Sequence, residues 1–171
     1  MELTLSLCTL KNLDTLIAIG KRTFTESFQE QNNPDDFNHY LESAFSKATI
    51  LSELKDPNTS FYFVYRGTIK VGYFKINKAA SQTDIKDDNS IELERIYVLK
   101  EHQGQRIGNY ILNWVMDFAR SKNKRYVWLG VWERNAKAID FYRRYGFVKF
   151  GTHPYYIGKD RQTDWLMRYD L

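Results

Sequence analysis

Hydrophobic and polar positions follow two periods along this chain, one typical of strands and one typical of helices. Ile91–Val98 is rich in β-branched, aromatic and leucine side chains, which predicts a strand. A polar loop with Gly104 follows, and apolar residues then recur at helical spacing: Ile107, Ile111, Leu112, Val115, Met116 and Ala119. A helix that begins after such a loop offers free backbone N–H groups and the positive end of its dipole. We therefore expect this stretch to bind a pyrophosphate.

Similar patterns predict the other elements. The predicted strands are Leu3–Thr9, Ser60–Tyr65, Ile69–Asn77, Tyr126–Val131, Phe147–Tyr156 and Thr163–Tyr169. The predicted helices begin near Asn12 and at Pro34, and two shorter ones cover Lys47–Leu54 and Ala136–Tyr145. The polar segment Ala79–Asn89 is expected to be a mobile loop. This order predicts an α/β (α+β) fold: one domain over residues 1–171, with a mixed sheet, helices on both faces and one central βαβ unit.

The composition limits the class of protein. Of the 171 residues 43% are hydrophobic, which is enough for a sizeable core. The chain has no apolar run long enough to span a membrane, no visible signal peptide and a single cysteine, and these features predict a cytoplasmic protein. A net charge of +4 permits an anionic ligand, but no helix-turn-helix signature or dense basic stripe points to nucleic acid. The three histidines lack ligand spacing, so no metal is expected.

Two motifs carry a more specific signal. The first is Gln103-Gly104-Gln105-Arg106-Ile107-Gly108, and the second, NAKAIDFYRRYGF, runs from Asn135 to Phe147. Together they resemble the GCN5-related N-acetyltransferase (GNAT) superfamily, which has Gln/Arg-x-x-Gly-x-Gly/Ala in a loop and Asn-x-x-Ala-x-x-Phe-Tyr-x-x-x-Gly-Phe downstream. The resemblance implies the GNAT fold, a mixed and mostly antiparallel twisted sheet, and acetyl-CoA as the cosubstrate.

Further segments are similar to the bacterial spermidine/spermine N-acetyltransferases, a subfamily also described as regulators of sporulation and degradative-enzyme genes. These segments are Phe28–Pro34, Tyr40–Phe45, Trp128–Glu133 and Gln162–Asp164. The similarity implies an enzyme that transfers acetyl groups to a primary amine, with a polyamine as the acceptor. The alternatives are another small-molecule or protein amine, and a non-catalytic CoA-binding regulator. Homodimers are common in the superfamily, so the resemblance also allows a homodimer.

The superfamily pattern assigns residues to CoA. Its pantetheine arm binds backbone groups that correspond here to Ile96, Tyr97 and Val98. The diphosphate is expected to take N–H groups from Gln103, Gly104, Gln105, Arg106, Ile107, Gly108 and Asn109. Asn135 corresponds to an asparagine that touches the pantetheine, although it can also cap the helix that begins at Ala136. Basic residues near the glycine loop, Lys137 among them, either meet the phosphates or form a solvated surface.

Arg106 departs from the family pattern, which usually has glycine at this position. A positive φ there would cost an arginine about 1 kcal/mol or more. We expect ordinary helical dihedrals at this helix N-terminus, so that the N–H group still points at the ligand.

Proton transfer is assigned to three residues. Tyr142 corresponds to the superfamily's general acid, and a phenol with a pKa near ~10 can protonate a departing thiolate; a core tyrosine is the alternative. Glu92 corresponds to the glutamate base of the superfamily, and Glu94, two residues further on, shares its strand face. The alternatives for this pair are an exposed strand face and a relay through water.

The acceptor site is expected near the acidic helical region before the hairpin, which caps that site in the superfamily. Glu26 and Glu30 are expected to attract a cationic amine there. Tyr40 and Tyr73 are expected to line its alkyl stem.

Overall fold

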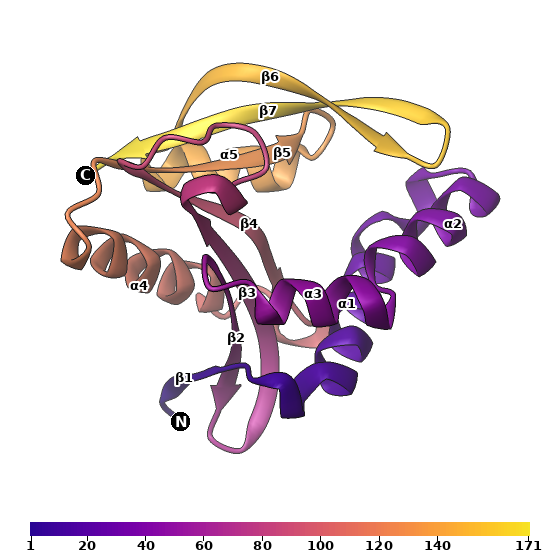
Figure 1. The fold of residues 1–171 in the computed structure, drawn as a ribbon, viewed down its shortest axis with the longest axis horizontal. Helices are drawn as coiled ribbons and strands as arrows, with labels where there is room; N and C mark the ends of the chain where they lie inside the picture. Colours follow the sequence, from indigo (N-terminus) through magenta and orange to yellow (C-terminus); the bar gives the residue numbers. More distant parts are fainter.

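A seven-stranded sheet in the order β1-β2-β3-β4-β5-β7-β6 organises the chain, whose residues 1–171 are all described by a computed structural model (Figure 1). The strands are β1 (Leu3–Leu7), β2 (Thr59–Arg66), β3 (Ile69–Lys78), β4 (Ser90–Val98), β5 (Tyr126–Trp132), β6 (Val148–Ile157) and β7 (Asp160–Asp170). The helices are α1 (Leu13–Phe28), α2 (Pro34–Ala44), α3 (Lys47–Lys55), α4 (Ile107–Ser121) and α5 (Ala136–Tyr145). The expected α/β (α+β) fold with a mixed, mostly antiparallel sheet is confirmed.

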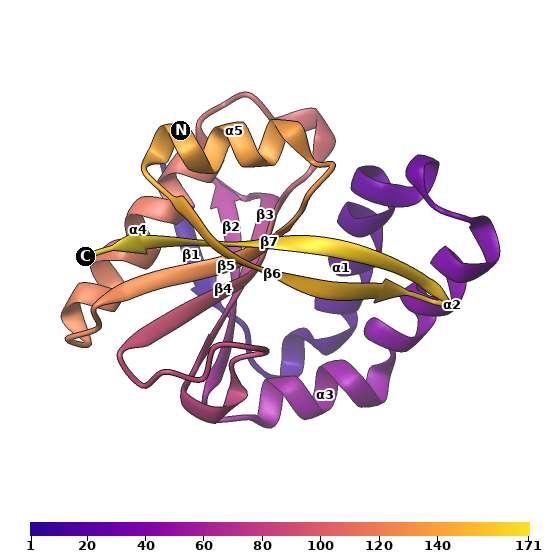
Figure 2. The same cartoon turned by 90° about the horizontal axis from the view of Figure 1, so that it is seen from above.

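The two central strands are parallel but stay paired over only a short length. Residues Ser90–Glu92 of β4 pair with Tyr126–Trp128 of β5, and no pairing continues beyond them. All other neighbouring strands are antiparallel. As a consequence β5, β6 and β7 run at a wide angle to β2 and β3, as Figure 2 shows. The sheet is therefore open between the second half of β4 and the second half of β5.

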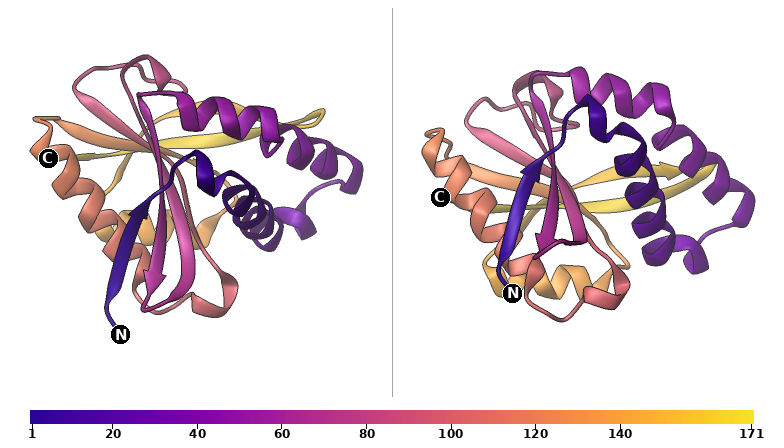
Figure 3. Two further views of the ribbon diagram at one scale, coloured as in Figure 1. Left: turned by 60° about the horizontal axis from the view of Figure 1, so that its bottom comes forward. Right: turned by 90° about the horizontal axis from the view of Figure 1, so that it is seen from below.

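Helices cover both faces of the sheet (Figure 3). On one face α4 and α5 bury a core with the central strands, and its members include Ile107, Ile111, Leu112, Val115, Ile139 and Tyr142. On the other face α1, α2 and α3 bury a second core, which includes Leu16, Phe24, Phe37, Ile50, Phe61 and Tyr73. No helix combines the length and apolar character needed to cross a membrane. No group of three or more His, Cys, Asp or Glu side chains is arranged to hold a metal ion.

The segment between β3 and β4 is tied to the sheet. The buried Gln82 side chain accepts hydrogen bonds from the Trp128 indole (2.8 Å) and the Ser90 hydroxyl (2.7 Å). Thr83 donates its backbone N–H and its hydroxyl to the carboxylate of Glu92. The start of this segment, which was expected to be a mobile loop, is therefore held against the sheet.

Candidate active site

Two adjoining cavities open where β4 and β5 diverge. The larger, of about 560 Å³, lies over the N-terminus of α4 and is called here the loop cavity. The smaller, of about 230 Å³, lies between α1 and the C-terminal strands and is called here the aromatic cavity, because its walls include Phe24, Phe28, Tyr97, Trp132 and Tyr155. The two cavities share lining residues from β4 and α5. One ligand can therefore extend from the first cavity into the second.

The loop cavity has the properties of an anion site. The backbone N–H groups of residues 104–109 have no hydrogen-bond acceptor in the protein. They lie at the N-terminus of α4, where the helix dipole adds a partial positive charge. The cations that line the cavity or its rim are Lys100, His102, Arg106, Lys137 and Arg144, with the histidine counted only when protonated. These groups together fit a diphosphate.

Arg106 enters the helix through a left-handed conformation. Its φ is +61° and its ψ is 17°, and it is the N-cap residue of α4. The expectation of ordinary helical dihedrals at Arg106 is therefore wrong. Gly104, with φ +75°, begins the same turn. Arg106 is its second left-handed residue and completes the turn before α4 begins. Glycine adopts this conformation without the clash of a Cβ atom, which explains why the superfamily pattern has glycine here.

Replacing Arg106 by glycine is expected to raise the free energy of unfolding by about 0.5–1 kcal/mol, because the strain of a side chain at positive φ is removed. For a chain of this size that corresponds to a rise in Tm of roughly 1–4 °C. Differential scanning calorimetry measures it. Gln105→Gly is the matched control, since Gln105 has no positive φ; glycine there increases chain entropy and removes the hydrogen bond that Gln105 accepts from Arg66, so it should lower the Tm. A lower Tm for Arg106→Gly than for the parent would contradict this account.

The free edge of β4 presents two residues to the gap. The N–H of Leu99 donates to the carbonyl of Val71 in β3 (2.9 Å). Because backbone groups alternate along a strand, Tyr97 also faces β3, whereas Ile96 and Val98 face the gap. The carbonyl of Val98 accepts a hydrogen bond from the Gln103 side chain (3.1 Å). Of the three expected backbone contacts to pantetheine, Ile96 and Val98 are thus oriented for it and Tyr97 is not.

Asn135 and Lys137 lie at the start of α5, next to the glycine loop. The Oδ1 atom of Asn135 accepts from the N–H of Ala138 (3.2 Å), so the capping alternative is present. Asn135 also lines both cavities, and its amide nitrogen donates to no protein atom. Lys137 lines the loop cavity and donates to Gln103 Oε1 at 3.4 Å. Both positions are compatible with the expected cofactor contacts.

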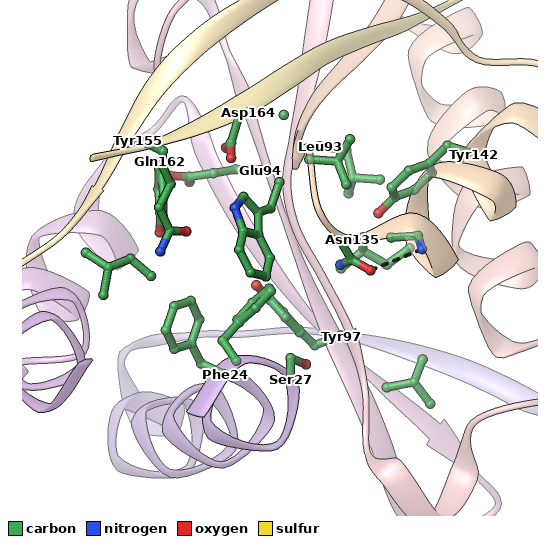
Figure 4. A pocket seen from close by; sticks show the side chains of 18 of the residues that line it. Phe24, Ser27, Leu93, Glu94, Tyr97, Asn135, Tyr142, Tyr155, Gln162 and Asp164 are labelled. Atoms are coloured by element: carbon green, nitrogen blue, oxygen red, sulfur yellow. Dashed lines mark hydrogen bonds between the residues drawn. The ribbon is translucent and has the colours of Figure 1, made fainter. Parts of the chain in front are cut away.

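Tyr142 lies at the junction of the two cavities (Figure 4). It is 8% exposed, and its ring packs against Phe141 and Phe147. The hydroxyl has no hydrogen-bond partner in the protein, although it lines both cavities. Burial raises the pKa of Tyr142 above its usual value, so the phenol stays protonated and can donate.

Comparisons with known proteins settle what kind of molecule this is. Residues 14–147 match the Acetyltransferase (GNAT) family. An uncharacterized N-acetyltransferase of Lactobacillus delbrueckii subsp. lactis is 34% identical over 158 residues, which cover 92% of this chain and 91% of that protein. The chain belongs to the acetyltransferase (GNAT) family. It is an acetyl-CoA-dependent N-acetyltransferase.

Two further comparisons describe fold and local similarity. The crystal structure of PaiA N-acetyltransferase from Thermoplasma acidophilum in complex with coenzyme A has a TM-score of 0.81 and 19% identity, and the match covers all of both chains. Streptothricin acetyltransferase of Streptomyces lavendulae is 39% identical over 61 residues, which are 36% of this chain and 32% of that protein. The first likeness concerns the GNAT fold alone, and the second covers only a segment.

Glu92 and Glu94 of this GNAT acetyltransferase share one strand face, as expected, because the amide of Asn77 donates to both carboxylates (2.9 and 3.0 Å). The strand bulges at Glu94, since Lys75 opposite pairs with Arg95 and the next residue pairs with Leu93. Glu92 is 2% exposed, accepts two further bonds from Thr83 and lines neither cavity. The hydrogen-bonding capacity of Glu92 is therefore used within the protein.

The protonation of the two glutamates differs. Burial and the nearby charge of Glu94 raise the pKa of Glu92 above its usual value. Burial also opposes the charge of Glu94, but Lys75 and Arg95 outweigh it and lower the pKa of Glu94. Lys75 is itself buried and forms an ion pair with Glu94 and another with Glu53 (3.1 Å). Glu94 lines the aromatic cavity as the ion-paired partner of Lys75.

The four residues expected to bind the acceptor do not line the aromatic cavity. Glu26 lines the loop cavity instead, where it pairs with Arg22 (3.0 Å) and accepts from the N–H of Lys100 (3.1 Å). Glu30 is exposed beyond the end of α1 and lines neither cavity. Tyr73 is fully buried, and Tyr40 lies one layer behind the cavity, where its hydroxyl contacts that of Tyr155.

The sequence interpretation missed part of the lining of the aromatic cavity, namely Phe24, Phe28, Trp132, Tyr155, Gln162 and Asp164. Figure 4 shows Asp164, Gln162 and Tyr155 on one side of it, across β4 from Tyr142 and Asn135. The segments that contain Trp132 and Asp164 were both part of the subfamily resemblance. The sequence signal therefore existed, but nothing in it indicated that strand β7 brings its side chains to this cavity.

Proposed function

We propose that this acetyltransferase acetylates the primary amine of a polyamine, spermidine or spermine, by direct attack on the thioester of acetyl-CoA. The aromatic cavity supports the proposal. It adjoins Tyr142, and it combines aromatic rings with the carboxylate of Asp164. Aromatic faces and a carboxylate are the groups that stabilise an alkyl ammonium and its apolar stem.

The donor side of the reaction follows from the loop cavity. The free N–H groups of residues 104–109 are suited to the diphosphate, and the gap-facing groups of Ile96 and Val98 are suited to the amides of the pantetheine arm. In this proposal the thioester lies at the junction of the two cavities, next to Tyr142. The amine nitrogen attacks the carbonyl carbon, the C–S bond breaks, and the phenol gives its proton to sulfur.

The size of a polyamine requires that its remote ammonium groups stay outside the aromatic cavity. Glu30 is exposed beyond the end of α1 and has no ion pair, so it is available to a cation in solvent. Glu26, in contrast, is already paired with Arg22. Long-range attraction of a polycation therefore rests on Glu30 more than on Glu26.

A compact amine is the second candidate acceptor. The aromatic cavity, at about 230 Å³, fits one aminoalkyl arm, so a small monoamine would fill it alone. The local similarity to a streptothricin acetyltransferase adds that larger amine to the acceptors to be tested. The two candidates differ in whether charges outside the cavity contribute to affinity.

An acceptor panel tests the proposal. Release of CoA is measured at saturating acetyl-CoA with spermidine, spermine, butylamine and streptothricin. Butylamine is the matched control, because it has the length of the aminobutyl arm of spermidine without the second charge. We expect a higher kcat/KM for spermidine and spermine than for butylamine. The reverse order would favour the compact amine, and no turnover with any amine together with retained CoA binding would favour a non-catalytic regulator.

A homodimer is a separate proposal, and sedimentation velocity tests it. The edge strand β6 exposes Val148 and Phe150, which are 66% and 39% exposed. A dimer formed through this strand would bury both side chains. A sedimentation coefficient that fits a monomer at micromolar concentration would exclude the dimer.

A further inference from the structure

Asp164 is the one carboxylate of the aromatic cavity without a partner in the protein. It lies on β7 between Trp132 of β5 and His153 of β6. Its Oδ2 atom is 3.3 Å from the point at which a Cβ atom on Gly130 would lie, so the absent side chain of that glycine leaves room for it. No hydrogen bond or ion pair joins the carboxylate to another residue. Its hydrogen-bonding capacity is therefore available to a ligand in the cavity.

The other two acidic side chains near the cavity are already engaged. Glu94 pairs with Lys75, and Glu92 accepts hydrogen bonds from Asn77 and Thr83. An ammonium group that enters between the aromatic rings therefore meets only one unpaired negative charge. Burying such a charge without a partner costs free energy, and a bound cation offsets that cost.

A second ionisable side chain, that of His153, lies beside Asp164 and reaches solvent. His153 is the direct cross-strand neighbour of Asp164, and such neighbours share a face of the sheet. The Nδ1 atom of His153 lies 3.0 Å from Asp84 Oδ2, which fixes the ring and leaves Nε2 free. The side chain of His153 is 40% exposed, so it also reaches water.

We propose that Asp164 receives the ammonium group of the acceptor and accepts its proton, and that a water molecule between Asp164 and His153 carries this proton to His153 and on to solvent. This inference rests on the proposed amine acetylation and names the residue that performs its first step. The ammonium loses one proton to Asp164 before attack, and the nitrogen loses a second as the tetrahedral intermediate collapses. Tyr142 gives one proton to sulfur and regains the second one from nitrogen. One proton per turnover therefore leaves through Asp164.

The electrostatics of the site agree with this role. Burial raises the pKa of Asp164 to about 6, and the nearby His153 opposes this only in part. A higher carboxylate pKa lies closer to that of an alkyl ammonium, roughly 10.4, and so reduces the cost of the transfer. The ionisable groups that line the cavity from the neighbouring elements are Glu94 and Tyr97 of β4, Tyr155 of β6 and Tyr142 of α5. His153 of β6, paired with Asp84, lies beside Asp164, and Tyr40 of α2 lies behind Tyr155.

The test compares Asp164→Asn with the parent, using the most active amine of the panel. We expect kcat/KM for the amine to fall about 10²-fold or more at pH 7. The loss should shrink as the pH approaches the pKa of the alkyl ammonium, about 10.4, because the amine is then already deprotonated in solution. The Kd of acetyl-CoA, measured by calorimetry, should not change. Asp170→Asn, on the same strand and outside both cavities, is the control and should match the parent.

Three results would overturn the inference. An Asp164→Asn enzyme with parental kcat/KM at every pH would exclude Asp164 as the base and leave the proposed function intact. A Glu92→Gln enzyme whose pH profile shifts, beside an unshifted Asp164→Asn profile, would assign the base to Glu92. A parent without turnover on any amine would refute the proposed function and this inference together. The His153→Gln variant tests the relay. Its kcat should be about fivefold lower than that of the parent, and an unchanged kcat would exclude His153 from proton release.

Discussion

Replacing Tyr142 by phenylalanine is expected to lower kcat by about 10²-fold and to leave the Kd of acetyl-CoA nearly unchanged. The variant keeps the ring that packs against Phe141 and Phe147, so the core is retained. It loses only the hydroxyl, which faces the cavities without a partner in the protein. Without this donor the CoA sulfur must leave as a thiolate or take its proton from water.

The pH dependence of the parent follows from the same residue. The pKa of Tyr142 is raised by burial, so the phenol keeps its proton at every pH below its usual value of about 10. We expect no descending limb from this residue between pH 6 and pH 10 in a profile of kcat. Tyr145→Phe is the matched control, because its hydroxyl donates to Asn113 on the outer surface (2.7 Å). Equal kcat values for the two variants would exclude Tyr142 as the acid.

Replacing Lys75 by methionine is expected to lower the free energy of unfolding by about 3 kcal/mol or more, because Glu94 and Glu53 lose their buried cation. The side chain of Lys75 is 4% exposed, and those of the two glutamates are 22% and 25% exposed. Denaturation in urea at pH 7 measures the loss. Lys78→Met, on the same strand with no ion pair, is the control and should change stability far less.

The effect of Lys75→Met should depend on pH in a defined direction. In the parent the pKa of Glu94 is lowered, against the effect of burial, by Lys75 and Arg95. Its ionic contribution is thus complete above the unfolded pKa, about 4.3, and is lost as the pH falls through the lower folded value. The difference between parent and variant should be largest at neutral pH and shrink below about pH 4. A difference that grows in acid would contradict this explanation.

The strand, loop and helix around Gly104 were predictable because each carries a strong local signal. Period-two and helical spacing change sharply between Val98 and Ile107, and the structure has β4 and α4 there. The second motif likewise placed α5 at Ala136–Tyr145. Local backbone preference and a buried face agree in these segments, so sequence pattern was sufficient.

The errors concern features that depend on distant contacts. A left-handed Arg106 is unfavourable by itself and is adopted because the loop and α4 fix the path of the chain. The bulge at Glu94 is a feature of the pairing with β3, and sequence spacing alone cannot reveal it. Glu26 and Tyr73 carry suitable chemistry, but their positions relative to the cavities depend on how α1 lies across the sheet.

The residue chosen for the amine proton shows the same limit most clearly. Asp164 is far from the two motifs in sequence, and only the pairing of β5 with β7 brings it beside Gly130. Its segment, Gln162–Asp164, belongs to the subfamily resemblance, but nothing in that resemblance indicates that the carboxylate reaches the cavity. Its neighbours in space, Trp132 and His153, come from two other strands.

The short pairing between β4 and β5 also affects how the protein responds to its donor. Three residue pairs join the two strands, so the halves of the sheet share few hydrogen bonds across their boundary. An acetyl-CoA molecule that hydrogen-bonds to β4 and also contacts α5 would link the two halves of the sheet. Folding and donor affinity are thereby coupled, and a donor concentration of 100 times its Kd adds about 2.7 kcal/mol to the resistance to unfolding. At such a concentration acetyl-CoA is expected to stabilise this enzyme as well as to supply its acetyl group.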